Sequence, residues 1–419
     1  MTNLHEEMVQ LGDRAVQAAR ELSSLTTRKK NAILEAMAQQ LDVRRGEVQR
    51  ENAKDLQAGR EAGLSAALLD RLELTEARID SMIKGLRDVA VLKDPVGAKI
   101  TRWMRPNGLE ILKVRVPIGV IAIIYESRPN VTADATALCF KTSNAVILRG
   151  GREAMHSNRI IAEILQTGGE KKGLPPDSIQ LVQTTDREAV RELVQLVGRV
   201  DLAIPRGGEG LIQAVTEMAR VPVIKHYKGI CHTFIDAEAD LDMAIAIAVN
   251  AKCQRPGVCN AMETLLVHQD IAPAVLPPLA ERMREQGVEL RGDEATRALI
   301  ADAKPATEED WHEEYLDLIL AIRVVPDVDA AIEHINTYGS QHSDAIVSNN
   351  ANHQKRFTQR VDSSTVYINA STRFTDGAEF GMGAEIGIST DKLHARGPMG
   401  LEELTTYKYV ISGEGQIRE

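Results

Sequence analysis

Apolar residues recur at three- and four-residue spacing along roughly the first ninety residues of the chain. The segments LGDRAVQAARELSSL, KKNAILEAMAQQLDVRR and SAALLDRLELTEARIDSMIKGLRDVA interleave these positions with charged side chains. This period places the apolar side chains on one face of an α-helix. We therefore expect helices over residues 3 to about 90, ending where Asp94-Pro95-Val96-Gly97 interrupts the pattern.

The pattern changes to alternation around Asn107-Gly108, a dipeptide that strongly favours a tight hairpin turn. Beyond this turn, Leu109 and Ile111 alternate with charged neighbours, as in a strand with one polar face. A half-polar hairpin that carries Trp103 and Met104 is either a surface flap or a pair of strands that binds a partner subunit. The alternation alone leaves both interpretations open.

Between residues 118 and 235, short apolar runs alternate with stretches of helical pattern. The runs are IGVIAIIY, NAVILR, SIQLVQ, DLAIP, VPVIK and HTFID. Continuous runs of branched apolar residues are typical of strands buried on both faces of a parallel sheet, and parallel strands are joined by right-handed crossovers. The segment therefore predicts a doubly wound α/β domain that binds its ligand at the carboxyl ends of the strands.

A second α/β pattern extends from residue 239 to about 400. DMAIAIAVNAK and IAPAVLPPLAERMREQ have helical spacing, AIRVVP and DAIVSNN have the character of strands, and the tail TTYKYVISGEGQIRE is again β-rich. A chain of 419 residues is long enough for two or more such domains.

Charge and composition exclude several classes of protein. The chain has 50 Lys and Arg against 60 Asp and Glu, a net charge of −10, which argues against a general nucleic-acid or acidic-membrane surface. No apolar run approaches the ~20 residues that span a bilayer, and the N-terminal stretch lacks the apolar segment of a signal peptide. We expect a cytoplasmic protein that binds neither nucleic acid nor membrane.

Cys259 stands in QRPGVCNAMETLLV, four residues after Arg255 and two residues after the Pro256-Gly257 turn. A nearby positive charge stabilises a thiolate, so Cys259 is either a nucleophile at a cleft or a small core residue. The spacing of Cys253 and Cys259 matches no zinc pattern, and no metal site is expected. The remaining cysteines, Cys139 and Cys231, lie in apolar patterns typical of the core.

Glycines and arginines gather at the turns that follow the predicted strands. Gly207-Gly208-Glu209-Gly210 lies between DLAIP and a helical stretch, where it forms either a phosphate-binding turn or simply a tight one. Guanidinium groups bind phosphate and carboxylate bidentately, so arginines at strand ends indicate an anionic ligand, although each could also be a surface ion-pair partner. These arginines are Arg128, Arg149, Arg152, Arg206 and Arg255.

Taken together, these segments resemble the aldehyde dehydrogenase superfamily over nearly the whole chain. PIGVIAIIYESRPNVTADATALCFKTSNAVILRGGREA is similar to its first strand, asparagine turn, helix and cofactor-binding strand; CNAMETLLVH is similar to the segment that begins with its catalytic cysteine, and EEYLDLIL to its Glu-Glu-Ile-Phe-Gly-Pro segment. Four motifs, IYESRPNVT, AIPRGGEGLI, QRPGVCNAMETLLV and YGSQHSDAIV, narrow the resemblance to the branch that reduces L-glutamate 5-phosphate.

The resemblance implies a fold and a domain organisation. We expect an aldehyde dehydrogenase-like α/β fold in which residues 1–101 and 119–229 form a doubly wound NADP-binding domain and residues 230–404 form an α/β catalytic domain. Residues 102–118 and 405–419 then form a small β oligomerisation flap. The resemblance thus favours the subunit-partner interpretation of the hairpin and implies a homo-oligomer.

The resemblance also implies catalytic and substrate-binding residues. Cys259 corresponds to the nucleophile, and Asn130, with the backbone N–H of Cys259, to the oxyanion hole. Arg128 and Arg255 are expected to bind the anionic groups of the substrate. At the position of the glutamate that activates water in hydrolytic relatives this chain has His226, whose own role stays open.

The nicotinamide cofactor is expected to be NADPH. Arg149 replaces the lysine that meets the cofactor ribose, and Arg152 stands where relatives that use NAD have an acidic residue. Gly207 and Gly208 belong to the turn that faces the cofactor, although Ile-Pro-Arg-Gly replaces the usual Phe-Thr-Gly-Ser there. Glu314 corresponds to the family's glutamate that binds the nicotinamide ribose.

The expected reaction is reduction of L-glutamate 5-phosphate to L-glutamate 5-semialdehyde and phosphate through a cysteine thioester, in proline biosynthesis. Glutamate kinase, which makes the unstable acyl phosphate, is a candidate for transient contact. A CoA-acylating aldehyde dehydrogenase and a catalytically silent binding protein on this fold are the alternatives. The arginine-rich turns favour a phosphate-bearing substrate, and the intact Cys259 and Asn130 argue against a silent protein.

Overall fold

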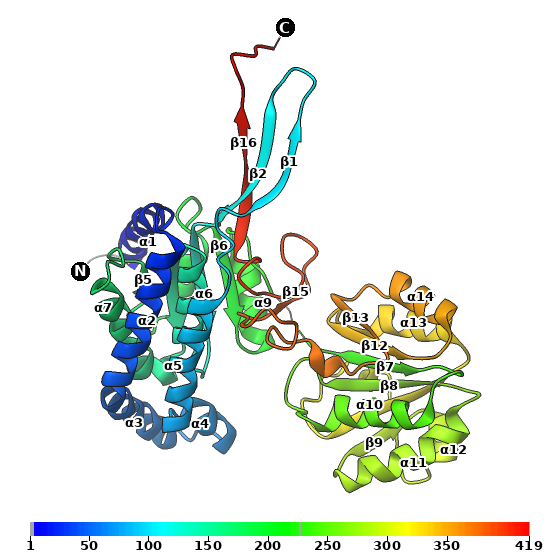
Figure 1. The fold of residues 1–419 in the computed structure, drawn as a ribbon. Helices are drawn as coiled ribbons and strands as arrows, with labels where there is room; N and C mark the ends of the chain where they lie inside the picture. Colours follow the sequence, from blue (N-terminus) through cyan, green and yellow to red (C-terminus); the bar gives the residue numbers. More distant parts are fainter. Residues whose placement is uncertain (1–3, 226–227, 419) are drawn as a thin grey trace. The chain divides into compact units, whose positions relative to one another are not determined.

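The computed structural model describes residues 4–225 and 228–418, and the chain divides into two compact units (Figure 1). Unit 1 comprises Met1–Lys225, Gly381–Gly387 and Met399–Glu419; unit 2 comprises His226–Phe380 and Ile388–Pro398. Unit 1 thus includes two segments from the C-terminal part of the chain, Gly381–Gly387 and Met399–Glu419. The functional domain limits expected from the sequence stay predictions.

The amphipathic segments at the start of unit 1 are helical, as their period predicts. The helices are α1 (Leu4–Leu22), α2 (Thr27–Val43), α3 (Arg45–Glu61), α4 (Ala66–Leu72) and α5 (Glu76–Val91). The hydroxyls of Thr26, Ser65 and Thr75 accept hydrogen bonds from backbone N–H groups in the first turns of α2, α4 and α5. Such caps satisfy donors that have no partner within the helix and so define where these helices begin.

A four-stranded parallel sheet lies in unit 1, with the order β5-β4-β3-β6. Its strands are β3 (Val120–Tyr125), β4 (Ala145–Gly150), β5 (Ile179–Leu181) and β6 (Leu202–Arg206), and the helices among them are α6 (Val131–Lys141), η1 (Arg152–Ala154), α7 (Met155–Glu170), α8 (Glu188–Val194) and α9 (Glu209–Met218). The strand order reverses at β3, whose neighbour β6 comes last along the chain. In doubly wound sheets ligands bind outside the carboxyl ends of the strands at such a point.

Two of the strands predicted between residues 118 and 235 do not belong to this sheet. The VPVIK run is not a strand, because within residues 221–225 only Val223 forms an isolated bridge, to Ala203. Pro222 has no N–H to donate, which explains why pairing stops there. The HTFID run is a strand, but it belongs to the sheet of unit 2.

The predicted hairpin and the C-terminal tail form a separate antiparallel sheet, β1-β2-β16, which extends away from the rest of unit 1 (Figure 1). Its strands are β1 (Lys99–Met104), β2 (Glu110–Pro117) and β16 (Thr405–Ser412). Large apolar side chains remain exposed on it, including Met104 at 58% and Ile411 at 59%. β1 and β2 pair antiparallel on either side of Asn107-Gly108, and Gly108 has φ +87°, so the predicted hairpin is confirmed.

Unit 2 is built on a seven-stranded parallel sheet with the order β10-β9-β11-β8-β7-β12-β13. Its strands are β7 (Cys231–Ile235), β8 (Met262–His268), β9 (Glu289–Gly292), β10 (Lys304–Pro305), β11 (Ile319–Val325), β12 (Ser343–Val347) and β13 (Thr365–Ile368). A two-stranded antiparallel pair, β14 (Ile388–Ser389) and β15 (Gly397–Pro398), also belongs to this unit.

Helices cover both faces of this sheet (Figure 1). They are α10 (Leu241–Cys253), α11 (Ala272–Glu285), α12 (Glu294–Leu299), α13 (Val328–Tyr338) and α14 (Ala351–Arg360), with the short 3-10 helices η2 (Glu309–His312) and η3 (Thr372–Phe374). Along β8, Leu265 and Val267 pack into the core under α10 and α11, whereas Leu266 packs with α13 and α14. The strand is thus buried on both faces, which explains its three consecutive apolar residues, Leu265 to Val267. No helix in the described ranges is long and apolar enough to cross a bilayer.

Candidate active site

Cys259 lies in the turn that joins α10 to β8 in unit 2, and its side chain is half-buried. An ion pair between the fully buried Lys252 and Glu263, with 2.5 Å between Nζ and Oε2, ties the end of α10 to the start of β8. Burial raises the pKa of Glu263 to about 7 and lowers that of Lys252. The turn is therefore held at both ends, and it places the thiol at the amino edge of the parallel sheet.

The backbone of Gly229 packs directly against this turn. A Cβ atom at residue 229 would stand 2.0 Å from the carbonyl oxygen of Cys259, so only glycine fits. The Gly229 N–H donates a hydrogen bond of 2.9 Å to Oε1 of Glu314, which places this carboxylate next to the Cys259 turn. The role of Glu314 toward a nicotinamide ribose stays a prediction, and His226 lies outside the described residues.

The other three cysteines lie in different surroundings. Cys139 and Cys231 are fully buried, as their apolar patterns predict, and burial raises the pKa of both thiols. The Cys231 Sγ lies 3.1 Å from the carbonyl oxygen of Cys259. Burial also raises the pKa of Cys253, whose sulfur contacts the sulfur of Met283 at 3.8 Å. Buried thiols with raised pKa values are poor nucleophiles, which leaves Cys259 as the best candidate among the four.

Two arginines of unit 2 lie close to Cys259. Arg255 is in the same turn and is exposed, and Arg373 comes from η3 and is half-buried. Burial lowers the pKa of Arg373, the charge of Arg255 lowers it further, and the Cys259 thiolate opposes both effects. The sequence predicted Arg255 as a substrate-binding residue but missed Arg373.

Arg128 and Asn130 lie in unit 1, in the turn between β3 and α6. The turn has Ser127 at φ +43°, and both the N–H and the hydroxyl of Ser127 donate to Oε1 of Glu153, at 2.6 and 2.8 Å. The Asn130 amide donates to Oδ2 of Asp134 at 2.9 Å, and burial raises the pKa of Asp134 to about 6. The amide of Asn130 thus has a defined orientation, whereas Arg128 is exposed.

Arg149 and Arg152 follow β4 but have different environments. The Arg149 side chain is buried, and its two Nη atoms donate to the carbonyl oxygens of Gly150, Thr185 and Asp186 at 2.8 to 3.4 Å. Its Nε is buried and has no hydrogen-bond partner among the residues that the structure describes. Arg152 is exposed, and its guanidinium makes no ion pair or hydrogen bond within the described part of the chain.

The glycine turn after β6 is closed by a carboxylate. Glu126 accepts a 3.1 Å hydrogen bond from the N–H of Gly208, directly before α9. A Cβ atom at residue 207 would stand 2.4 Å from the same Glu126 oxygen, so Gly207 cannot be replaced without a shift. The turn lies at the carboxyl end of β6, beside that of β3, where the strand order predicts a ligand.

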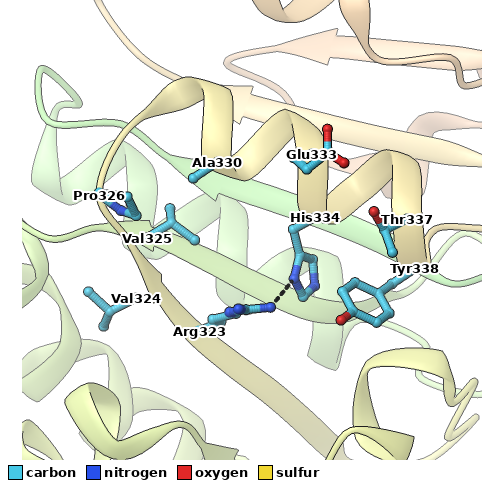
Figure 2. Close-up of a pocket in the computed structure, with 9 residues that line it drawn as sticks. All are labelled: Arg323, Val324, Val325, Pro326, Ala330, Glu333, His334, Thr337 and Tyr338. Carbon is cyan, nitrogen blue, oxygen red and sulfur yellow. Dashed lines mark hydrogen bonds between the residues drawn. The ribbon is translucent and has the colours of Figure 1, made fainter.

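A pocket of about 310 Å³ in unit 2 contains none of the predicted site residues. Figure 2 shows Arg323 on β11 reaching toward His334 on α13, and its Nη1 lies 2.9 Å from Nδ1 of His334. Burial, with the neighbouring positive groups, lowers the pKa of His334 to about 2, so the ring is neutral and accepts this hydrogen bond. The pair links β11 to α13 and has no group suited to acyl transfer.

Several residues that orient the predicted site were not found from the sequence. Asp134 follows Asn130 by four residues on a helix, a spacing that could have indicated the contact. Arg373 lies five residues after β13, a strand that was not predicted from the sequence, so the signal that singled out the other arginines was lacking. Glu126 and Glu153 carry no local signal, because their partners are positioned by the sheet.

Comparisons with known proteins agree with the observed fold. The family model described as "Aldehyde dehydrogenase family" matches residues 4–304. A curated gamma-glutamyl phosphate reductase of Moorella thermoacetica is 58% identical over 417 residues, covering 100% of both chains. One of Halothermothrix orenii is 55% identical and covers 99% of this chain and 100% of its own.

A solved structure shows the same likeness. The crystal structure of gamma-glutamyl phosphate reductase from Thermotoga maritima is 49% identical, with a TM-score of 0.97, and the match covers 99% of this chain and 100% of that one. The observed α/β architecture with its parallel sheets is the fold of this family. The chain therefore belongs to the aldehyde dehydrogenase family of oxidoreductases, in the group of the gamma-glutamyl phosphate reductases.

Proposed function

We propose that the chain reduces L-glutamate 5-phosphate to L-glutamate 5-semialdehyde and phosphate with NADPH, through a thioester on Cys259, in proline biosynthesis. The observation that carries this proposal is Cys259 itself. It is a half-buried thiol held in a turn at the edge of a parallel sheet, in a chain that is 58% identical over its whole length to a gamma-glutamyl phosphate reductase.

The first half of the reaction is acyl transfer. The Cys259 thiolate attacks the acyl carbon of the substrate, the bond from that carbon to the phosphate oxygen breaks, and inorganic phosphate leaves. Positive charge from Arg255 and Arg373 stabilises the thiolate, since a guanidinium nearby lowers the cost of the anionic form. The product is a thioester on Cys259.

The second half needs a hydride, which the nicotinamide cofactor used by this family supplies when bound. The side-chain amide of Asn130 then donates a hydrogen bond to the oxyanion that forms, and Asp134 orients that amide. When the C–S bond breaks, the semialdehyde is released and the Cys259 thiolate returns. A hydrogen-bond donor of this kind typically contributes ~10²–10³ in rate.

The residues of unit 1 fit a dinucleotide that carries a 2′-phosphate. Arg152 offers an exposed guanidinium, and the buried Nε of Arg149 has no partner among the described residues. Gly207 and Gly208 form the turn at the carboxyl end of β6, beside that of β3, where the strand order predicts a ligand. These features support NADPH rather than NADH as the cofactor.

We also propose that the protein acts in the cytoplasm as a homo-oligomer, without nucleic acid or membrane as partners. The exposed apolar side chains on β1, β2 and β16 support association of subunits through this sheet. Glutamate kinase remains a candidate for transient contact, because its product is the unstable substrate.

The test uses the reverse reaction. Oxidation of glutamate 5-semialdehyde with NADP⁺ should require added phosphate, with arsenate as a substitute. Sustained NADPH formation at a similar rate in phosphate-free buffer would show that water accepts the acyl group and would overturn the proposal; a requirement for coenzyme A would favour the CoA-acylating alternative.

A matched pair of variants tests the nucleophile. Cys259→Ala should abolish activity while Cys253→Ala should retain most of it, because Cys253 packs against Met283. Alkylation should label Cys259, and substrate should protect it. Substrate protection of Cys253 instead would mean that the nucleophile is misassigned.

A further inference from the structure

Arg373 is joined to the Cys259 turn by a set of hydrogen bonds around Asn260, the residue after Cys259. The Thr372 hydroxyl donates to the carbonyl oxygen of Asn260 at 2.7 Å. The Asn260 amide donates to the carbonyl oxygens of Thr375 at 2.8 Å and Arg373 at 3.4 Å. Because both termini of η3 are bound to one residue, the backbone of Arg373 has a defined position beside the nucleophile.

The Arg373 side chain is held on one side only. Its Nε donates to Oε1 of Gln254 at 2.9 Å, which orients the guanidinium plane. Neither of its Nη atoms has a hydrogen-bond or ion-pair partner within the part of the chain that the structure describes, and the same is true of the guanidinium of Arg255. Two guanidinium groups near one thiol are thus available to an anion.

Two positive charges close together repel one another, and burial of one of them adds to the cost. This is visible in Arg373, whose pKa is lowered first by burial and then by Arg255. An oxyanion bound between the two guanidinium groups would relieve both costs, and guanidinium groups bind phosphate through paired N–H donors.

We propose that Arg373, together with Arg255, binds the phosphoryl group of the substrate, and binds inorganic phosphate in the reverse reaction. The proposal rests on the proposed function. It assigns these arginines to the phosphate rather than to the α-carboxylate for two reasons. The doubly charged phosphate balances two guanidinium groups, and it is bonded through one oxygen to the carbon that Cys259 attacks, whereas three carbons separate the α-carboxylate from that carbon.

In the forward direction this pair of cations assists the leaving group. As the bond from the acyl carbon to the phosphate oxygen breaks, both electrons of that bond go to the phosphate, and its growing negative charge is met by the guanidinium groups. In the reverse direction the same groups hold phosphate for attack on the thioester, and the thiolate of Cys259 leaves.

The experiment separates the two substrates of the reverse reaction, since the semialdehyde carries the α-carboxylate and phosphate is added separately. In Arg373→Gln, the KM for phosphate should rise about 10- to 100-fold, the usual effect of one lost charge-assisted contact. The KM for the semialdehyde should change less than about twofold. Arg373→Lys should recover part of the loss, because it restores the charge but not the paired donors.

Arg356→Gln is the matched control, since Arg356 is an exposed arginine of α14 that pairs with Asp329. It should leave both KM values unchanged. A rise in the KM for the semialdehyde with an unchanged KM for phosphate in Arg373→Gln would assign Arg373 to the α-carboxylate and overturn the proposal. Unchanged values for both substrates would overturn it as well.

A second measurement does not depend on turnover. Inorganic phosphate should slow the alkylation of Cys259 in the wild type, as followed by mass spectrometry of its peptide, and should lose most of that effect in Arg373→Gln. Equal protection in both proteins would contradict the proposal even if Arg373→Gln were inactive. If the wild type oxidised semialdehyde without phosphate, the proposed function would fail, while this measurement would still decide whether Arg373 binds the anion.

Discussion

Replacement of Asp134 by alanine should change the stability of the protein and its activity in opposite directions as the pH rises: the variant gains unfolding free energy relative to the wild type, but its kcat is lower. Asp134 is a carboxylate enclosed beside Asn130, and burial raises its pKa from 3.8 to about 6 although Arg206 lowers it in part. The rise of about 2 pKa units corresponds to about 3 kcal/mol, since one unit is 1.36 kcal/mol. This energy favours the protonated carboxyl in the folded state, so ionisation of Asp134 destabilises the fold.

The sign of the pH dependence follows from the raised pKa. Because the folded state binds this proton more tightly than the unfolded state, the stabilisation is fully present below pH 3.8 and is lost as the pH rises through about 6. The difference in unfolding free energy between Asp134→Ala and the wild type should therefore shift by about 2.4 kcal/mol in favour of the variant between pH 4 and pH 8. The shift does not depend on the pH-independent cost of the cavity that alanine leaves.

The activity of the same variant should fall. Without Asp134 the Asn130 amide loses the acceptor that orients it at 2.9 Å, and we expect kcat to decrease about 10- to 100-fold. The loss of an oxyanion-hole donor altogether, ~10²–10³, sets the upper limit. Asp134→Asn, whose side chain does not ionise either, should show the same pH-dependent shift relative to the wild type but retain more activity, because its side-chain oxygen still accepts a hydrogen bond.

Urea unfolding between pH 4 and pH 8 measures the first effect, and steady-state kinetics the second. An unfolding free-energy difference that is constant with pH would show that burial does not raise the pKa of Asp134. An unchanged kcat in Asp134→Ala would show that the reaction does not need Asn130 to be oriented by this carboxylate.

Three further predictions concern the cofactor, the fold and the assembly. Arg152→Glu should depress use of NADPH relative to NADH by about 10- to 100-fold, and an unchanged ratio of kcat/KM values would remove Arg152 from the cofactor site. Lys30→Met should lower the unfolding free energy by about 3–5 kcal/mol, because it leaves the buried carboxylate of Asp94 without its 2.5 Å partner; the exposed neighbour variant Lys29→Met is the control, and equal stability of the two variants would refute this reasoning. Deletion of residues 405–419 removes β16, which pairs with β2 from Thr405 to Ser412, and should shift the protein toward monomer in light scattering; a monomeric, active full-length chain would contradict a role of the β1-β2-β16 sheet in assembly.

Most of the secondary structure could be predicted because its signals are local. The helical period over the first ninety or so residues, the buried runs that became β3, β4 and β6, and the hairpin at Asn107-Gly108 are all confirmed. The error at VPVIK arose because an apolar run with a proline has the composition of a strand but lacks one of its donors.

The candidate site was predicted in part. Cys259, Asn130 and Glu314 lie in motifs that resemble a known family, so they could be named without a fold. Their partners could not, because Gly229, Glu153 and Arg373 contact the site from other elements of the chain. Arg373 donates to Gln254 across 119 residues of sequence, and no period or motif relates two positions so far apart.

The sequence by itself determined most of the helices and strands, the turn that precedes the Cys259 thiol, and the clustering of arginines at strand ends. Each of these depends on side chains within a few residues of one another. Only the tertiary structure decided that Arg149 binds backbone carbonyls while Arg152 stays exposed, and that Asp134 is buried enough to raise its pKa to about 6. The physical reason is that burial and the partners of a charged group are set by the packing of distant segments, which a local pattern does not contain.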